Sequence, residues 1–209
     1  MYEALLFDLD GTLIDTESIA TRTGLAAFAS VGFPVTLDFL HGLVGVDQAT
    51  AAHAIRALHA GIDIDQLNQF WSAGFKVEAD KGIALKPFVQ QILTLAPHLP
   101  RAVVTSSGRD YAHQKLAMAG IGDAFAVVVT VDDVAKAKPD PEPYFLAARK
   151  LGVIAARCLV FEDSEAGAEA AHRAGCTVVH VSDLVPSSGR WAHHVASDLM
   201  AGARLAGLV

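Results

Sequence analysis

The sequence predicts an α/β fold, a doubly wound parallel sheet core with an inserted all-helical domain. Short apolar runs without polar alternation recur along the chain, as expected for parallel strands that are covered on both faces. Patterns of helical periodicity lie between these runs, and strands that alternate with helices indicate a parallel sheet with crossover connections. Residues 16–82 depart from this alternation because they show helical patterns only.

The apolar runs define the expected strands of the sheet. They are residues 4–7, 102–105, 126–130, 158–161 and 177–181. The helical patterns between the later runs cover residues 87–96, 109–119, 141–151 and 164–174. Gly120, Gly152 and Gly175 follow the last three patterns, and glycine is the typical stop after a helix.

The all-helical interval predicts a second domain inserted into the first. It contains patterns at 17–31, 47–60 and 63–79 and a short segment near 37–43. An interval of this length is too long for a single strand-to-helix connection. We therefore expect a core formed by residues 1–15 and 83–209 and a helical cap formed by residues 16–82. The cap follows the first strand, so we expect it over the carboxyl edge of the sheet, where α/β folds bind ligands.

The composition is that of a folded protein with a net negative charge, which disfavours binding to polyanions. Hydrophobic residues make up 52% of the 209 residues, which excludes intrinsic disorder and allows a core without disulfides. The formal net charge is −7, from 16 Lys and Arg against 23 Asp and Glu. We therefore expect neither nucleic-acid nor anionic membrane partners. The sequence leaves the oligomeric state, monomer or dimer, open.

We find no targeting or membrane segment in the sequence. The first apolar run lies between Glu3 and Asp8 without a basic segment before it, unlike a signal peptide. No apolar run reaches the roughly 20 residues that a membrane span needs. Cys158 and Cys176 match no CxxC or zinc spacing and fit small buried side chains. These observations favour a cytoplasmic protein.

Two carboxylates follow the first expected strand. Strand alternation places Asp8 and Asp10 on one side of the chain, and Gly11 lets the backbone turn directly after them. Two neighbouring carboxylates repel each other unless a cation or a proton lies between them. Carboxylate oxygens suit hard divalent cations, so the pattern favours Mg²⁺.

Three later clusters also stand at expected strand ends. A turn of Thr105, Ser106, Ser107 and Gly108 opens a helix, and helix starts of this kind attract phosphate. Lys138 lies in the segment KPDPEP, whose prolines fix the backbone near a helix start. Residues 161–164 read FEDS, with Gly167 following. Each cluster alone fits a helix cap or a solvated charge, but all of them fall at one edge of the expected sheet.

The four clusters resemble the four motifs of the haloacid dehalogenase-like (HAD) superfamily. DLDGT is similar to the first motif, VVTSS to the second, KPDP to the third and FEDSxxG to the fourth, in their usual order. The resemblance covers essentially the whole chain, and the helical insert looks like a C1-type cap. Within the superfamily, the sequence is similar to the subgroup of β-phosphoglucomutases and sugar-phosphate phosphatases.

The resemblance implies roles for the acidic residues. Asp8 is the expected nucleophile, forming an aspartyl-phosphate, and Asp10 the expected general acid and base. The implied Mg²⁺ ligands are Asp8, the backbone carbonyl of Asp10, and Asp163, with Glu162 as a further ligand or as support.

The resemblance also implies a phosphate-binding set. Lys138 and Thr105 are expected to bind the phosphoryl oxygens, together with the backbone amides of Leu9 and Ser106. Mg²⁺ and Lys138 together supply positive charge that lets a phosphate dianion approach the carboxylates.

Several branches of the superfamily fit less well. The second carboxylate, Asp10, disfavours L-2-haloacid dehalogenases and phosphonatases, and Lys76 and Lys81 in the cap fit solvated helix charges. β-Phosphoglucomutases carry a cap histidine and a cap arginine, but the corresponding residues here are Ala20 and Gln48. Losing that arginine removes a clamp for a second phosphate, which favours a hydrolase over a mutase.

The cap sets the substrate, and here the sequence is less informative. Residues 15–18, DTES, followed by Arg22, resemble phosphatases of phosphorylated hexoses and of 6-phosphogluconate. His41, Gln48 and Arg109 are the candidates to contact a polyol chain or a carboxylate. Trp71 and its neighbour four residues on, Phe75, fit the core of the cap better than a substrate platform.

The expected function is that of an Mg²⁺-dependent phosphatase, a phosphoric monoester hydrolase for a small phosphate monoester. A sugar or sugar-acid phosphate such as 6-phosphogluconate is the expected substrate class. A β-phosphoglucomutase-type enzyme and a catalytically silent HAD-fold binding protein remain as alternatives. Phosphoacceptor receiver domains share the acidic pair, the lysine and Mg²⁺, but they are shorter and lack a helical insert after the first strand.

Overall fold

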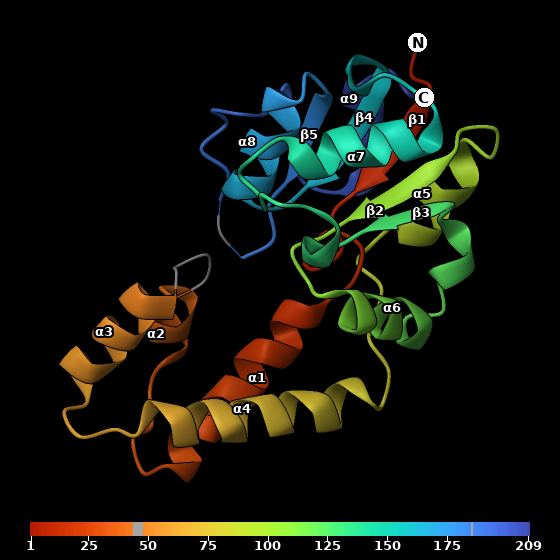
Figure 1. The fold of residues 1–209 in the computed structure, drawn as a ribbon. Coiled ribbons are helices and arrows are strands. Elements are labelled where there is room, and N and C mark those ends of the chain that lie inside the picture. The colour runs from red at the N-terminus through yellow and green to blue at the C-terminus, as the bar shows by residue number, and fades with distance from the viewer. Residues whose placement is uncertain (44–47, 185) are drawn as a thin grey trace. The chain divides into compact units, whose positions relative to one another are not determined.

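A computed structural model describes residues 1–43, 48–184 and 186–209, apart from the side chains of residues 48 and 49 (Figure 1). The chain forms two compact units. One consists of Met1–Asp15 with Ala84–Val209, and the other of Thr16–Ile83. This division falls one residue later than the boundary expected between residues 82 and 83. The two connections lie side by side, since the Asp15 N–H donates to the Ala84 carbonyl at 2.9 Å and Ile14 bridges Leu85.

The larger unit is built on a parallel sheet in the order β3-β2-β1-β4-β5-β6. The strands are β1 Ala4–Phe7, β2 Arg101–Val104, β3 Val127–Val129, β4 Cys158–Glu162, β5 Thr177–Val181 and β6 His194–Ala196. β1 lies between β2 and β4, with Phe7 in register with Val103 on one side and Phe161 on the other. The predicted α/β fold class is confirmed. β6 lies outside the five predicted runs, because only its last residue is buried and its apolar pattern is short.

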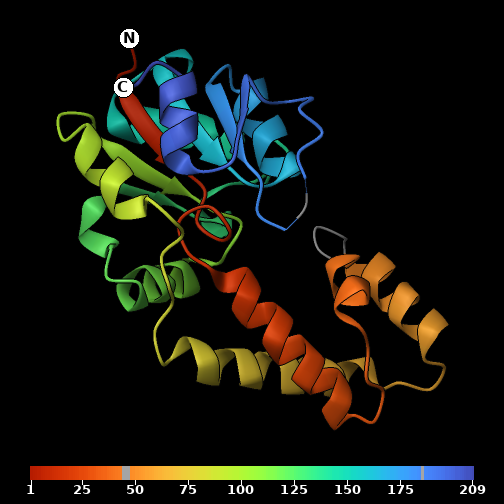
Figure 2. The same cartoon turned by 180° about the vertical axis from the view of Figure 1, so that it is seen from behind.

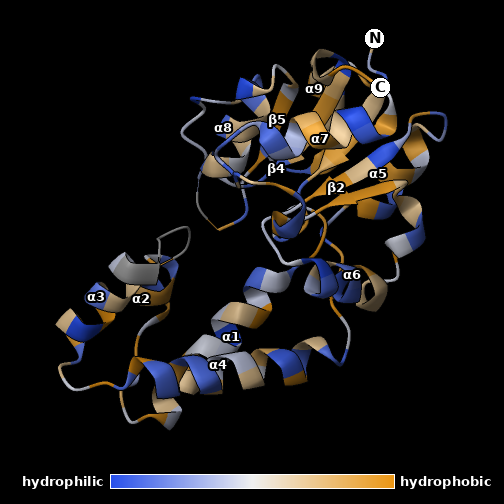
Figure 3. Cartoon of the chain, in the orientation of Figure 1, coloured by the Kyte–Doolittle hydropathy of each residue, from blue (hydrophilic) through white to orange (hydrophobic). Residues whose placement is uncertain are grey.

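Helices cover both faces of this sheet, as Figures 1 and 2 show from opposite sides. They are α5 Val89–Leu95, α6 Arg109–Met118, α7 Glu142–Leu151, α8 Glu165–Arg173 and α9 Leu199–Leu205, with 3₁₀ turns η1 Gly122–Ala124, η2 Val131–Asp133 and η3 Ala155–Arg157. The apolar strands run through the middle of the unit between the helices (Figure 3). A Cβ atom at Gly202 of α9 would overlap the Val179 side chain, so the missing side chain lets α9 approach β5.

The smaller unit is all-helical. Its helices are α1 Thr16–Ser30, α2 Leu37–His41, α3 Gln48–Leu58 and α4 Ile64–Ala79. Phe28 is fully buried in its core, and its ring meets those of Phe39 and Trp71 edge-on. Trp71 also donates from Nε1 to the Ala20 carbonyl at 2.9 Å, and Gly24 leaves room for the indole, since a Cβ there would overlap it.

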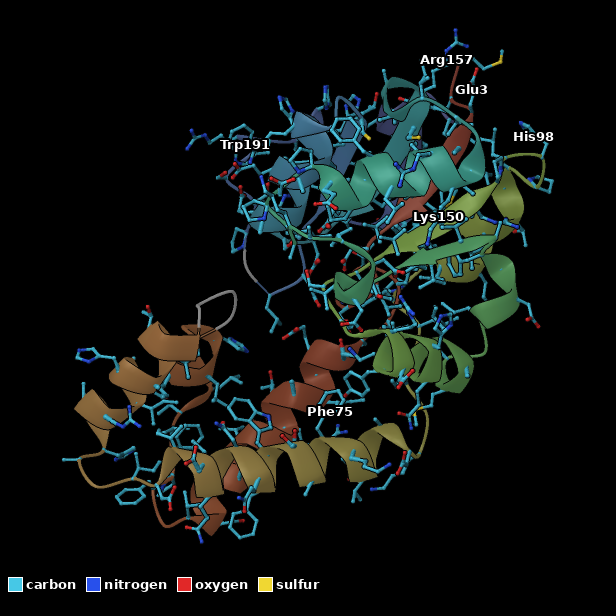
Figure 4. All side chains as sticks on the ribbon, viewed as in Figure 1. Glu3, Phe75, His98, Lys150, Arg157 and Trp191 are labelled. Carbon is cyan, nitrogen blue, oxygen red and sulfur yellow. The ribbon has the colours of Figure 1, made fainter. Side chains whose placement is uncertain are left out.

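Phe75 differs from Trp71 in its surroundings. Trp71 packs against the buried core of the helical unit. Phe75, one turn later on α4, is partly buried (Figure 4). Both side chains line an open hollow on α4 together with Asn68 and Ser72. The expected core role fits Trp71, and that of Phe75 stays a prediction. Among the helices that the structure describes, none combines the length and apolarity that crossing a membrane requires.

Candidate active site

The carboxyl ends of three neighbouring strands bring the predicted motifs together. Asp8 follows β1, Thr105 follows β2, and Glu162 and Asp163 stand at the end of β4. β2 and β4 flank β1, and parallel strands end at the same edge of a sheet. Lys138 reaches this edge from the segment between η2 and α7. Four segments that are far apart in the sequence therefore meet within the larger unit.

Lys138 is held at the centre of the cluster. Its Nζ donates to Asp8 Oδ1 at 2.7 Å, to Glu162 Oε1 at 2.6 Å and to the Val104 carbonyl at 2.8 Å. An ammonium group has three protons, so these bonds use all of its donors. The side chains of Lys138, Asp8 and Glu162 are 5%, 10% and 0% exposed. The lysine is thus fixed in place and oriented toward the predicted nucleophile.

Glu162 supports the lysine from the end of β4. Besides Lys138, its Oε1 accepts from the Tyr144 hydroxyl at 2.7 Å, and its Oε2 accepts from the Ser164 hydroxyl at 3.0 Å. A Cβ at Gly167 would overlap the Glu162 carboxylate, which explains the glycine at this place in the motif. Both oxygens are engaged by protein donors, so Glu162 fits support better than direct ligation of a cation.

Burial and charge shift the protonation of this cluster. Burial raises the pKa of the Asp8 carboxyl to about 8, and the Lys138 ammonium only partly offsets this effect. Burial lowers the pKa of Lys138, but the charges of Asp8 and Glu162 outweigh it and raise that pKa overall. Burial, followed by the charges of Asp8 and Glu162, raises the pKa of Asp163 well above its ordinary value. Lys138 therefore supplies too little positive charge to offset the burial of Asp8 and Asp163. A bound cation would favour the ionised forms of these two carboxylates.

The donor atoms fit a divalent cation. Carboxylate oxygens of Asp8, Glu162 and Asp163 lie within 4.8 Å of one another. Oxygen ligands of this kind suit Mg²⁺. Thr12 donates from Oγ1 to Asp163 Oδ1 at 3.4 Å, and His180 Nε2 lies 2.7 Å from the Asp163 carbonyl oxygen. These contacts orient the Asp163 side chain and backbone toward the cluster.

Gly11 and the ion pair between Lys86 and Asp183 lie next to Asp163. Gly11 has φ +83°, and a Cβ there would overlap the Asp163 carboxylate, so this turn requires glycine. Asp183 approaches the same point, and its Oδ1 accepts from Lys86 Nζ at 2.6 Å. The Asp183 charge contributes to the raised pKa of Asp163. Sequence reasoning assigned no role to Asp183 or Lys86.

Asp10 has its own cationic partner. Lys115 Nζ, on α6, donates to Asp10 Oδ1 at 2.7 Å and to Oδ2 at 2.8 Å. The Ser107 hydroxyl donates to Asp10 Oδ2 at 2.9 Å. Sequence reasoning missed Lys115, although a signal was present. Lys115 shares the buried face of α6 with Ala112 and Leu116, and a lysine on an apolar stripe requires a buried partner.

The predicted phosphate-binding residues surround the same edge. Thr105 is buried, and its hydroxyl accepts from the Ser107 N–H at 3.1 Å. Leu9 is buried directly after Asp8, and Ser106 is exposed directly after Thr105. Leu9, Thr105 and Ser106 thus follow the ends of the neighbouring strands β1 and β2. Their binding of phosphate remains a prediction.

The residues predicted to contact the substrate lie on different elements of the chain. Arg109 is half-exposed and pairs through Nη2 with Asp133 Oδ1 at 2.7 Å, on the side of β3. His41 ends α2 in the helical unit and is partly buried. Gln48 begins α3, but its side chain lies outside the described residues, and Arg22 pairs with Glu78 on the helical unit. Contacts of His41, Gln48 and Arg109 with a substrate remain predictions.

The chain matches known proteins over most of its length. A family model described as haloacid dehalogenase-like hydrolase matches residues 5–181. The validoxylamine A 7'-phosphate phosphatase of Streptomyces hygroscopicus subsp. limoneus is 36% identical over 84% of this chain and 83% of that protein. The fructose-1-phosphate phosphatase YqaB of Escherichia coli is 32% identical, over 86% and 96%. A crystal structure of a putative β-phosphoglucomutase from Thermotoga maritima is 26% identical with a TM-score of 0.83, covering 99% of each chain.

The chain belongs to the haloacid dehalogenase-like hydrolase family. The family resemblance inferred from the four motifs is confirmed, and so is the assignment to enzymes of the phosphoric monoester hydrolase class. The matched region, residues 5–181, contains all four motifs.

Proposed function

We propose that this member of the haloacid dehalogenase-like hydrolase family is an Mg²⁺-dependent phosphatase of small sugar or sugar-acid phosphates. The supporting observation is the buried Asp8 carboxylate, bonded to Lys138 at 2.7 Å and lying beside Asp163. A nucleophile of this kind needs a nearby cation to accept a phosphate dianion, and the cluster offers Lys138 together with oxygen ligands.

In the first half-reaction, a carboxylate oxygen of Asp8 attacks phosphorus. The bond between phosphorus and the ester oxygen breaks, and its electron pair stays on the leaving alkoxide. Asp10 donates a proton to that oxygen, and the alcohol departs. Lys138 offsets the negative charge on the phosphoryl oxygens, because its ammonium is buried and fixed by three acceptors. The product is the Asp8 acyl phosphate.

In the second half-reaction, water attacks the same phosphorus atom. Asp10, now ionised, takes a proton from the water, and the bond between Asp8 and phosphorus breaks. Inorganic phosphate leaves, and both carboxyl groups return to their starting states. Asp10 can serve both steps because it stands two residues after Asp8 at the same edge of the sheet, and its side chain is 26% exposed.

The residues that would hold Mg²⁺ are Asp8 and Asp163, with the backbone carbonyl of Asp10. When bound there, the ion would neutralise charge and polarise the phosphoryl group. Glu162 would act on this site indirectly, since its oxygens accept from Lys138, Tyr144 and Ser164. Gly11 leaves the space that the Asp163 carboxylate occupies.

The substrate class follows from the relatives and from the cap. Two relatives are named as phosphatases of validoxylamine A 7'-phosphate and of fructose 1-phosphate, and the DTES segment of this chain resembles sugar-phosphate phosphatases. We include 6-phosphogluconate as a specific candidate. A phosphomutase is the second candidate, because the structural likeness to a putative β-phosphoglucomutase extends over 99% of the chain. Ala20 and Gln48 weigh against it, since neither provides the mutase histidine or arginine.

A phosphate-release screen tests this proposal. The panel contains hexose phosphates, 6-phosphogluconate, glycerol phosphates, phosphoglycolate and nucleotides, each with Mg²⁺, with and without EDTA. β-Glucose 1-phosphate isomerisation is followed in parallel. We expect selective release from one sugar-phosphate class that EDTA abolishes. Isomerisation without release would replace the phosphatase by a mutase, and no turnover of any ester would favour a silent binding protein.

A further inference from the structure

We propose that Lys115 is a positioning residue that, together with Ser107, fixes the Asp10 carboxylate for acid–base chemistry. This inference rests on the proposed function, because it assumes that Asp10 transfers protons. The resemblance to the family motifs points to Lys138 but not to a lysine on α6. The observation is therefore a second buried ammonium, on a separate helix, facing the second carboxylate of DLDGT.

The contacts of Lys115 involve both oxygens of one carboxylate. Nζ lies 2.7 Å from Asp10 Oδ1, 2.8 Å from Asp10 Oδ2 and 3.0 Å from Ser107 Oγ. Ser107 in turn donates to Asp10 Oδ2 at 2.9 Å. The three groups form a closed triangle of polar contacts. A carboxylate held at both oxygens cannot rotate about its last side-chain bond without losing at least one of these bonds.

The lysine is itself held by its helix. Its side chain is 6% exposed, and Ala112 and Leu116 on the same face of α6 are buried. The Tyr111 ring, one turn earlier, lies 4.3 Å from Nζ and covers it from the side. Because α6 begins directly after the turn that carries Ser107, one continuous segment presents both Ser107 and Lys115 to Asp10.

A fixed orientation matters for the proposed role. Proton transfer requires the donor and acceptor to be aligned, and general acid–base catalysis by a placed group contributes about 10²–10⁴-fold. Without Lys115, Asp10 would lose the ammonium that contacts both of its oxygens, beside the like charge of Asp8. We therefore expect Lys115 to act on turnover through Asp10 and not by contact with the reacting atoms.

A double-mutant cycle separates this role from a purely structural one. The variants are Lys115→Met, Asp10→Asn and the combination, tested on an alkyl phosphate that the wild-type enzyme hydrolyses. We expect Lys115→Met to lower kcat by about 10-fold or more in the wild-type background. In the Asp10→Asn background the same change should alter kcat less than about 2-fold, because the residue that it positions is already disabled.

The leaving group provides a second measurement. The leaving group of p-nitrophenyl phosphate needs little protonation. The rate of the nitrophenolate burst should therefore fall far less in Lys115→Met than the kcat for the alkyl ester. Lys115→Arg keeps the charge and can contact both oxygens, so it should recover part of the loss. Lys76→Met is the matched control, because Lys76 is 68% exposed in the helical unit, and its kcat should equal that of the wild type.

The outcomes are distinguishable. Equal losses from Lys115→Met in both backgrounds, or no loss in either, would overturn the positioning role while leaving the phosphatase intact. A wild-type protein that hydrolyses no ester would overturn the proposed function itself. Circular dichroism and the melting temperature check folding. If Lys115→Met does not fold, Ser107→Ala serves in the same cycle, with a smaller loss in the wild-type background and none beside Asp10→Asn.

Discussion

The two carboxylates of the DLDGT segment stand two residues apart, yet their surroundings differ. Asp8 is bonded to Lys138 in a site closed by β2, β4 and α7, and its side chain is 10% exposed. Asp10 is bonded to Lys115 on α6 and to Ser107 in the turn before it, and its side chain is 26% exposed. Each carboxylate has one buried lysine, but Lys138 also has a buried carboxylate and a tyrosine behind it.

This difference suits two different tasks. A nucleophile must keep one position through both half-reactions, and several elements hold Asp8 and Lys138 in place. An acid–base group must exchange protons with the substrate and with water, and partial exposure allows this at Asp10. The two carboxylates should therefore respond differently to substitution, with the largest effect at Asp8, the proposed nucleophile. The smallest effect is expected at a carboxylate outside the cluster.

Replacing Asp8, the proposed nucleophile, should have the largest effect. Asp8→Asn should lower phosphate release by at least about 10³-fold, because the carboxylate oxygen that forms the acyl phosphate is replaced by an amide. The fold should persist, since asparagine keeps the volume and removes a buried charge. Steady-state phosphate release and the melting temperature measure both effects. Residual activity within about tenfold of wild type would contradict the role of Asp8.

The support behind Lys138 should be sensitive to added volume. Gly167→Ala places a methyl group where the Glu162 carboxylate lies, and overpacking of this kind costs roughly 1–3 kcal/mol of unfolding free energy. We also expect kcat to fall, since Glu162 positions Lys138. Denaturant unfolding measures the first effect. Gly122→Ala is the matched control, because a Cβ at Gly122 meets nothing within 4 Å, and a similar loss there would contradict this explanation.

Removing one hydroxyl should have an intermediate effect. Tyr144→Phe deletes the donor to Glu162 Oε1 and leaves that fully buried oxygen with Lys138 only. Loss of a partner by a buried polar group costs about 1–3 kcal/mol. Tyr2→Phe is the control, because the Tyr2 hydroxyl donates to the Ala206 carbonyl in a partly buried contact away from the cluster. Thermal unfolding should show the larger loss for Tyr144→Phe, and equal losses would argue against a special role for the Glu162 network.

Asp133, a carboxylate outside the cluster, should show the smallest effect. Its pKa is shifted downward, whereas the pKa of Asp8 is shifted upward. Burial raises the pKa of Asp133, but hydrogen bonds from the Thr130 backbone and hydroxyl outweigh it, so the pKa is lowered overall. Its stabilising contribution is therefore present above the ordinary value of 3.8 and is lost as the pH falls through the folded-state value below it.

The corresponding variant is Asp133→Asn, which weakens the capping box of η2. It should reduce the unfolding free energy by about 1 kcal/mol at neutral pH. The difference from wild type should shrink in acid, below about pH 4. Urea unfolding at a series of pH values measures it, and a difference that does not depend on pH would show that the charge of Asp133 contributes nothing.

The sequence alone determined five of the strands in the sheet and the positions of the motifs. The runs around Ala4–Phe7 and Cys158–Glu162 are apolar and bounded by acidic turns, so local composition was sufficient to predict strands ending in carboxylates. The alternation of strands and helices then required a parallel sheet, which places every strand end at one edge. Grouping Asp8, Asp10, Lys138, Glu162 and Asp163 in one site also required the resemblance to the family motifs, because alternation alone does not give the order of the strands.

Only the tertiary structure decided which side chains meet. The apolar stripe of its helix indicates that Lys115 is buried, but its contact with Asp10 depends on how α6 is placed beside the segment after β1. The Tyr144 hydroxyl on α7 reaches Glu162 at the end of β4, and Lys86 meets Asp183 because the segment after β5 returns to the connection at residues 84–86. Periodicity identifies which face of a helix is buried, but it does not identify the residue of another helix or strand that this face contacts. That partner is set by packing between segments distant in sequence.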